Sequence, residues 1–202
     1  MTALSRKVVE IFGKGQSGKS KLLNDLLYQR GNERCIIFDF KNEIDATYRT
    51  NDLQKLYRYC KDGVFFRVVV SNPMLFPALC EMVKTMRNVT FAVDEMQMVV
   101  GNRAAISDAL KEMCFVGTMR KINMYLTTQR PIKMHGDLRS QYTEVILFNQ
   151  SEPDDLKWIR GAAGGKAVAA DVQHLKPHHY ITVSWDGVIG RGVTTPPQKG
   201  RR

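Results

Sequence analysis

The stretch Gly13-Lys14-Gly15-Gln16-Ser17-Gly18-Lys19-Ser20 fits the pattern GxxxxGK[ST] in full. Residues 7–12 before it are rich in β-branched side chains, and residues 19–30 have the leucine spacing of an amphipathic helix. Glycine lets backbone N–H groups curve around a phosphate, where a Cβ would collide with it. A helix that begins at such a loop also points its positive dipole end at the same anion. Strand, glycine-rich loop and helix in this order predict a phosphate-binding α/β domain.

The residue types in this loop indicate a nucleotide with a magnesium ion. Lys19 is placed to reach the β- and γ-phosphates, and the Ser20 hydroxyl is placed to ligate Mg²⁺. We therefore expect ATP and Mg²⁺ as ligands. The expected nucleotide-binding set is Gly13, Lys14, Gly15, Gln16, Ser17, Gly18, Lys19, Ser20 and Lys21.

Two further strand ends carry residues suited to hydrolysis. The apolar run 89–94 ends in the adjacent carboxylates Asp94 and Glu95, about 75 residues after the loop. Asp94 would complete the Mg²⁺ shell, and Glu95 would orient and polarise the attacking water. The run 123–128 is followed by Gln129, which lies before Arg130 and Pro131. In a sheet of this type, Gln129 would lie close to the γ-phosphate and sense it.

Short β-rich runs alternate with longer helical patterns along most of the chain. This order predicts a doubly wound, mostly parallel sheet with helices on both faces, an α/β fold of the RecA-like P-loop NTPase class. Asp186-Gly187 predicts the two-residue turn of a C-terminal hairpin. We expect one domain over residues 1–193 and a basic, flexible tail over residues 194–202. The expected strands are 7–12, 34–40, 64–70, 89–94, 123–128, 144–148, 180–185 and 188–193, and the expected helices are 19–30, 52–60, 74–86, 104–119 and 153–160.

The composition indicates the kind of partner and argues against two classes of protein, those with a structural metal and those that span a membrane. Thirty Lys and Arg residues against twenty Asp and Glu give a net charge of +10, which favours a polyanionic partner, nucleic acid or an anionic membrane surface. No CxxC pair is present, so a structural metal is not expected. The most apolar run, residues 64–70, contains Arg67 and is far shorter than a membrane span, so we expect a soluble protein without a transmembrane segment.

The loop, the Asp-Glu strand end and the Thr-Gln-Arg-Pro strand end resemble, in order and spacing, the FtsK–HerA superfamily of DNA-pumping ATPases. The segment 38–43 (FDFKNE) also looks like the Asp-Pro-Lys-Gly-Glu segment of that superfamily, with Phe40 in place of proline and Asn42 in place of glycine. The resemblance covers residues 7 to 150, strongly at the three motifs, and residues 151–202 do not contribute to it.

Within this superfamily the small chain looks most like the genome-packaging ATPases of tailless icosahedral viruses with an internal membrane. The resemblance implies an ATPase, expected to be stimulated by DNA, that moves double-stranded DNA into a preformed capsid. It also implies a homo-oligomeric ring, commonly a hexamer, that meets capsid-vertex or internal-membrane proteins. The corresponding location is the host cytoplasm or the packaging vertex of the virion. Filamentous-phage assembly ATPases and conjugation ATPases share the motifs and are the first alternative.

In such a ring an arginine from the neighbouring subunit completes the site, and this can be worth about 10³–10⁵ in rate. Arg120, Arg130 and Arg139 are the candidates, and we favour Arg120 slightly over Arg139. Arg103 and Lys133 are candidates for contact with DNA phosphates.

Two other classes of function remain open. A small-molecule kinase also uses a phosphate loop and a doubly wound sheet, although it does not need the combination of Glu95 and Gln129. A non-motor switch would bind ATP and a partner protein without sustained turnover. The run 176–179 (KPHH) is more simply a surface turn than a metal site, since no carboxylate or thiol lies at a suitable spacing.

Overall fold

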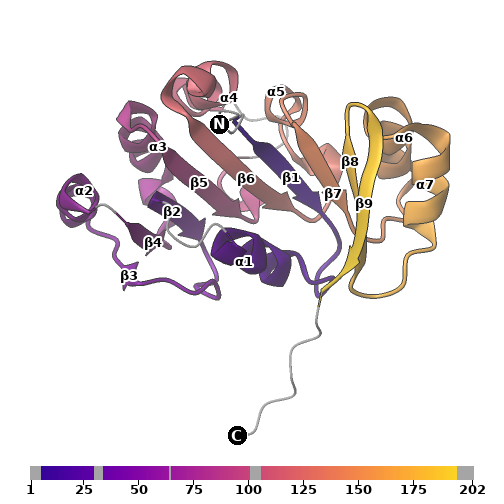
Figure 1. Ribbon diagram of the computed structural model, residues 1–202, viewed down its shortest axis with the longest axis horizontal. Coiled ribbons are helices and arrows are strands. Elements are labelled where there is room, and N and C mark those ends of the chain that lie inside the picture. The colour runs from indigo at the N-terminus through magenta and orange to yellow at the C-terminus, as the bar shows by residue number, and fades with distance from the viewer. Residues whose placement is uncertain (1–5, 30–33, 64, 101–105, 195–202) are drawn as a thin grey trace, which may run out of the picture.

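The computed structural model describes residues 6–29, 34–63, 65–100 and 106–194. Its centre is a nine-stranded sheet in the order β3-β4-β2-β5-β6-β1-β7-β8-β9 (Figure 1). The strands from β3 to β7 run parallel, and β8 and β9 are antiparallel to their neighbours. The strands are β1 (Val8–Phe12), β2 (Arg34–Asp39), β3 (Tyr48–Arg49), β4 (Phe66–Val70), β5 (Val89–Asp94), β6 (Ile122–Thr128), β7 (Glu144–Leu147), β8 (His179–Ser184) and β9 (Gly187–Val193).

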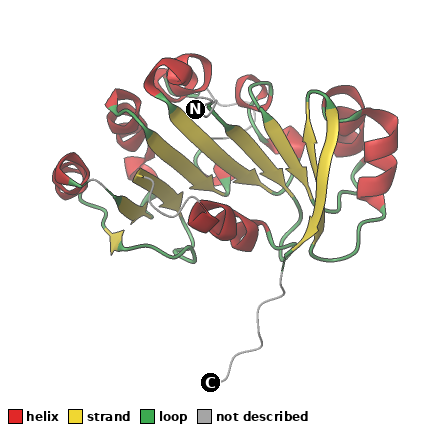
Figure 2. Cartoon of the chain, in the orientation of Figure 1, coloured by secondary structure: helices red, strands yellow, loops and turns green. Residues whose placement is uncertain are grey.

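Helices cover both faces of the sheet unequally (Figure 2). Leu22, Leu23 and Leu27 of α1 pack on one face, where each buried leucine contributes about 1.5–3 kcal/mol. Apolar side chains of α2 to α7 pack on the other face. The helices are α1 (Lys19–Gln29), α2 (Leu53–Asp62), α3 (Phe76–Thr85), α4 (Asp108–Arg120), α5 (Gly136–Arg139), α6 (Pro153–Ala162) and α7 (Gly165–Gln173), and the 3₁₀ turns are η1 (Pro73–Leu75), η2 (Met96–Met98) and η3 (Pro131–Lys133).

The expected fold class is confirmed: the sheet is mostly parallel, has helices on both faces and ends in a hairpin. Several boundaries differ for local reasons. The Ser107 hydroxyl accepts a hydrogen bond from the Leu110 N–H, so α4 begins later than expected. The hairpin turn lies at Trp185 and Asp186, one residue before the expected Asp186-Gly187 pair.

The parallel register aligns the ends of three central strands. Phe12 of β1 lies opposite Thr128 of β6, and Val93 of β5 lies opposite Leu126 of β6. The loop after β1, the acidic pair at the end of β5 and the residues after β6 therefore meet at one edge of the sheet. This is the carboxyl edge, where ligands bind in open α/β sheets.

One acidic side chain lies inside the core, away from this edge. Glu10 in the middle of β1 is fully buried, and neither of its carboxylate oxygens has a hydrogen-bond partner among the described residues. Burial raises the pKa of Glu10 well above its ordinary value, against an opposing effect of the positive charge of Arg139. Burial without a hydrogen-bond partner therefore favours the neutral form of Glu10 in the folded protein.

None of the described helices is long and apolar enough to cross a membrane. Of the expected C-terminal tail, Thr194 is buried, and residues 195–202 lie outside the described residues.

Candidate nucleotide-binding site

The glycine-rich loop joins β1 to α1 at the carboxyl edge. Its backbone is held by hydrogen bonds from the Gly13 N–H to the Thr128 carbonyl (3.3 Å) and from the Ser17 N–H to the Lys14 carbonyl (3.3 Å). Gly18 has a φ of +102°, which residues other than glycine rarely adopt, and α1 begins at the next residue. The loop therefore ends at a helix N-terminus, as an anion-binding loop requires.

A cavity of about 530 Å³ opens beside this loop, a size within the usual range for small-ligand sites. Its wall combines the loop with three charged side chains from other elements and one histidine. The lining residues are Gly15, Gln16, Ser17, Gly18, Lys19, Ser20, Lys21, Lys41, Glu43, Glu95 and His178. The structure thus brings together seven of the nine predicted nucleotide-binding residues in one cavity wall.

Ser20 and Asp94 lie together at the base of the site. The Ser20 hydroxyl donates to Asp94 Oδ2 at 3.0 Å, and the Thr127 hydroxyl donates to Asp94 Oδ1 at 2.7 Å. Asp94 is buried, and these bonds fix both of its oxygens. A hydroxyl and a carboxylate are hard oxygen ligands of the kind that Mg²⁺ prefers, so the donor set fits this ion.

Glu95 has an unusual backbone and an unpaired oxygen. Its φ of 56° and ψ of 63° are in the left-handed region, and its N–H donates to the Thr127 hydroxyl at 2.9 Å. Strained non-glycine conformations of this kind cluster at functional sites. The side chain is 3% exposed, and its Oε2 has no hydrogen-bond partner among the described residues. Oε2 is thus an available acceptor for a water molecule in the cavity.

Lys19 is held inside the loop. Its ammonium donates to the Lys14 carbonyl at 3.1 Å and lies 3.7 Å from Glu95 Oε1. Burial lowers the pKa of Lys19, and the charges of Glu95 and Asp94 act in the opposite direction. A buried cation at the floor of a glycine-rich loop is well placed to pair with a phosphate anion.

Gln129 follows β6 directly, but it does not line the cavity formed by the described residues. Its carbonyl accepts a hydrogen bond from the buried amide of Gln150 at 3.0 Å. The neighbouring Ser151 hydroxyl accepts from the Lys14 ammonium at 2.6 Å. The segment after β7 therefore ties the phosphate loop to the end of β6, a link that no sequence motif revealed.

The candidate arginines lie outside the cavity wall formed by the described residues. Arg120 ends α4 at the amino edge of the sheet, where its carbonyl accepts from the Asn88 N–H. Arg139 donates to the Pro131 carbonyl at 3.2 Å and lies over the Trp158 ring. Arg130 forms a 2.8 Å ion pair with Asp155 in its own chain. A role for any of them in a neighbouring subunit stays a prediction. Arg103, proposed for DNA contact, lies outside the described residues.

His178 lines the cavity together with Lys41 and Glu43, although the sequence predicted only a surface turn at this position. It lies in the turn between α7 and β8 with a φ of +67°, and its carbonyl accepts from the Thr194 N–H at 2.9 Å. Thr194 in turn fills the space beside Gly18, where an added Cβ would lie 2.3 Å from the Thr194 hydroxyl. The C-terminal quarter of the chain therefore contributes His178 to the cavity wall and places Thr194 beside Gly18. Within the described ranges, no group of three or more His, Cys, Asp and Glu side chains is arranged to hold a metal.

No family model matches this sequence, and no curated protein sequence is similar to it. The fold does match solved structures. The genome-packaging NTPase B204 of Sulfolobus turreted icosahedral virus 2, in complex with ATPγS, is 20% identical, with a TM-score of 0.79 over 97% of this chain and 100% of that one. The DNA-packaging ATPase B204 of Sulfolobus turreted icosahedral virus is 22% identical, with a TM-score of 0.68 over 95% of this chain and 98% of that one.

A more distant match comes from conjugation. The pCW3 conjugation coupling protein TcpA, with ATPγS, is 11% identical, with a TM-score of 0.68 over 96% of this chain and 61% of that one. The resemblance to DNA-pumping ATPases, and to the genome-packaging ATPases among them, is thus confirmed at the level of the fold: this chain has the P-loop NTPase fold that these proteins share.

Proposed function

We propose that this protein is a DNA-translocating ATPase that drives double-stranded viral DNA into a preformed capsid. The observation that carries the proposal is the group of Lys19, Ser20 and Glu95 on one cavity wall at the carboxyl edge, with Asp94 bonded to the Ser20 hydroxyl. The fold match over almost the whole length of two viral packaging ATPases supports this choice of substrate.

In this proposal the residues divide the work of hydrolysis. The loop N–H groups and Lys19 bind the phosphates, and Ser20 with Asp94 would hold Mg²⁺, which neutralises charge on the phosphate oxygens when bound. Glu95 orients a water molecule through Oε2 and takes its proton as the bond to the γ-phosphate forms. The bond between the β- and γ-phosphates breaks, which leaves ADP and inorganic phosphate. Gln129 would sense the γ-phosphate from the end of β6.

The expected partner is the DNA backbone. A subunit of net charge +10 repeated around a ring, commonly a hexamer, concentrates positive charge that DNA phosphates would offset. Contacts to phosphates carry no sequence information, which suits a protein that must move any genome. Of the two candidates for such a contact, Lys133 lies at the end of η3, and Arg103 lies outside the described residues. Capsid-vertex or internal-membrane proteins would be the further partners, in the host cytoplasm or at the virion vertex.

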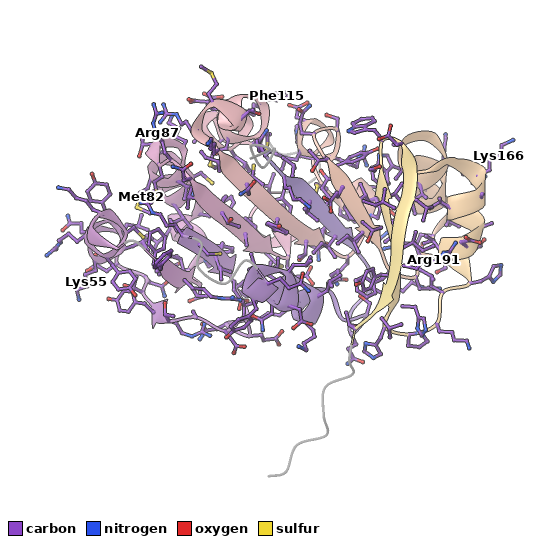
Figure 3. The ribbon with its side chains drawn as sticks, viewed as in Figure 1. Lys55, Met82, Arg87, Phe115, Lys166 and Arg191 are labelled. Carbon is purple, nitrogen blue, oxygen red and sulfur yellow. The ribbon has the colours of Figure 1, made fainter. Side chains whose placement is uncertain are left out.

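The test is the rate of ATP hydrolysis with and without duplex DNA, for the wild type and for two variants. Glu95→Gln should still bind ATP but lose about 10²–10⁴ in rate, because the proton acceptor is gone. Lys19→Ala should lose binding or turnover with its fold intact. Lys166→Ala, an exposed lysine on α7 (Figure 3), is the matched control and should behave like the wild type.

Three results would point elsewhere. Wild-type turnover in Lys19→Ala would contradict the assignment of the loop. Transfer of phosphate to an added small molecule would indicate a kinase. A single turnover without DNA stimulation would indicate a nucleotide-dependent switch.

A further inference from the structure

The segment between β2 and β3 is built around a buried carboxylate. Asp39, at the end of β2, accepts hydrogen bonds from the backbone N–H groups of Lys41 (3.0 Å), Asn42 (3.0 Å) and Ile44 (2.7 Å). Asn42 takes a left-handed φ of 62°, and the Arg49 guanidinium donates to its side chain. These bonds fix the backbone that carries Lys41, so its side chain is attached at a fixed point in the cavity wall.

The register of the sheet brings this segment to the acidic pair, since Asp39 of β2 lies opposite Asp94 of β5. The Lys41 ammonium lies 3.4 Å from Glu95 Oε1, the same oxygen that lies 3.7 Å from the Lys19 ammonium. Two lysines thus share one oxygen of one buried carboxylate. Charge pairing requires only one of them.

The two lysines differ in how freely they can leave Glu95. Lys19 is 4% exposed and also donates to the loop carbonyl of Lys14. The Lys41 side chain is 41% exposed at the cavity wall, and among the described residues its ammonium donates a hydrogen bond to Glu95 Oε1 alone. Lys41 can therefore move into the cavity by rotating its own side chain, while the anchored backbone stays in place.

We propose that Lys41 is a second phosphate-binding lysine, which holds Glu95 Oε1 in the resting protein and transfers to the terminal phosphate of a bound nucleoside triphosphate. The inference rests on the proposed function. A terminal phosphate carries more negative charge than one carboxylate, so it outcompetes Glu95 for the ammonium. The transfer removes one positive charge from Glu95 Oε1, so the carboxylate becomes a stronger proton acceptor for a water molecule on Oε2 when the third phosphate is present. ADP lacks that group and leaves the pair with Glu95 in place.

The experiment measures the affinity for ATP and for ADP, each with Mg²⁺, by displacement of a fluorescent nucleotide. Lys41→Met should weaken ATP binding about tenfold or more, the size expected for a hydrogen bond between charged groups, and ADP binding less than twofold. Lys41→Arg should restore most of the preference for ATP, because it keeps the positive charge. Lys166→Met is the control for removing an exposed lysine elsewhere.

Thermal unfolding of each variant separates a contact with phosphate from a role in the fold. An exposed lysine contributes within about 0.5 kcal/mol, so the melting temperature of Lys41→Met should stay within about 2 °C of the wild type. Loss of ATP preference at an unchanged melting temperature supports the proposal. Equal weakening of ATP and ADP overturns it, as does an unchanged preference for ATP in Lys41→Met.

A wild type that binds neither nucleotide would overturn the proposed function itself. A wild type that binds and hydrolyses ATP, together with a Lys41→Met variant that still prefers ATP, overturns only the role of Lys41. If Lys41→Met unfolds at a lower temperature, the Lys41→Arg variant decides. A folded Lys41→Arg variant that binds ATP no more tightly than ADP also overturns the role of Lys41.

Discussion

Replacement of the buried Glu10 should stabilise the protein, and the gain should grow with pH. Glu10 has no hydrogen-bond partner for either oxygen among the described residues, and leaving a buried polar group unpaired costs about 1–3 kcal/mol. Glu10→Met has a similar shape without the polar group and should recover this amount. For a domain of this size, that corresponds to a melting temperature higher by about 2–4 °C for each kcal/mol.

The pH dependence follows from the raised pKa of Glu10 in the folded state. Above the ordinary carboxyl pKa of about 4.3, the unfolded chain releases a proton that the folded protein keeps. The free energy of unfolding of the wild type therefore falls as the pH rises, by at most about 1.4 kcal/mol per pH unit until the raised pKa is reached. Between pH 5 and pH 7 this amounts to at most about 2.7 kcal/mol. Glu10→Gln cannot ionise, so it should be close to the wild type at pH 5 and more stable at pH 7.

Urea unfolding followed by circular dichroism at pH 5, 6 and 7 measures these differences. Asp186→Asn, in the exposed hairpin turn, is a control that should follow the wild type at each pH. The reasoning fails if Glu10→Gln and Glu10→Met are both less stable than the wild type at pH 7 and equally so at pH 5. That result would mean that Glu10 is ionised in the fold and paired with Arg139, the cation that lowers its pKa.

Two further predictions concern the edges of the site. Gly18→Ala should destabilise the protein by about 1–3 kcal/mol, because Gly18 has a positive φ and because an added Cβ would lie 2.3 Å from the Thr194 hydroxyl. In thermal unfolding, the double variant with Thr194→Ala should recover part of this loss, since the clash is then removed. Full recovery would mean that the backbone at residue 18 is not strained. Arg130→Ala should lower the free energy of unfolding by about 3–5 kcal/mol, because it leaves the fully buried Asp155 carboxylate without its cation. Asp155→Ala should lower it by about 1–3 kcal/mol, because the Arg130 side chain left behind is 32% exposed and can reach water. Urea titrations that gave the reverse order would refute this reasoning from burial.

The predictions that succeeded rest on local chemistry. The glycine-rich loop, the run that ends at Asp94 and the leucine spacing of α1 are each contained in a short stretch of sequence. Glycine geometry, β-branched packing and helical periodicity act over a few residues, so the fold class and the meeting of Ser20 with Asp94 could be predicted without coordinates.

The features that sequence reasoning missed depend on contacts between distant segments. The pairing of Lys41 with Glu95 follows from the register of β2 and β5, and the place of His178 follows from the return of the chain through Thr194. The hairpin turn shifted by one residue because the Trp185 indole stacks on Tyr142 and donates to its carbonyl at 2.9 Å. An Asp-Gly dipeptide says nothing of such a partner.

The contact of Thr194 with Gly18 has a practical consequence for the handling of this protein. A label or substitution at Thr194 therefore acts directly on the phosphate loop. A label there would report on nucleotide binding but could also obstruct it. The Arg6 guanidinium bonds instead to the carbonyl of Ile122 at the start of β6, so the chain at residue 6 lies at the opposite edge of the sheet from this loop.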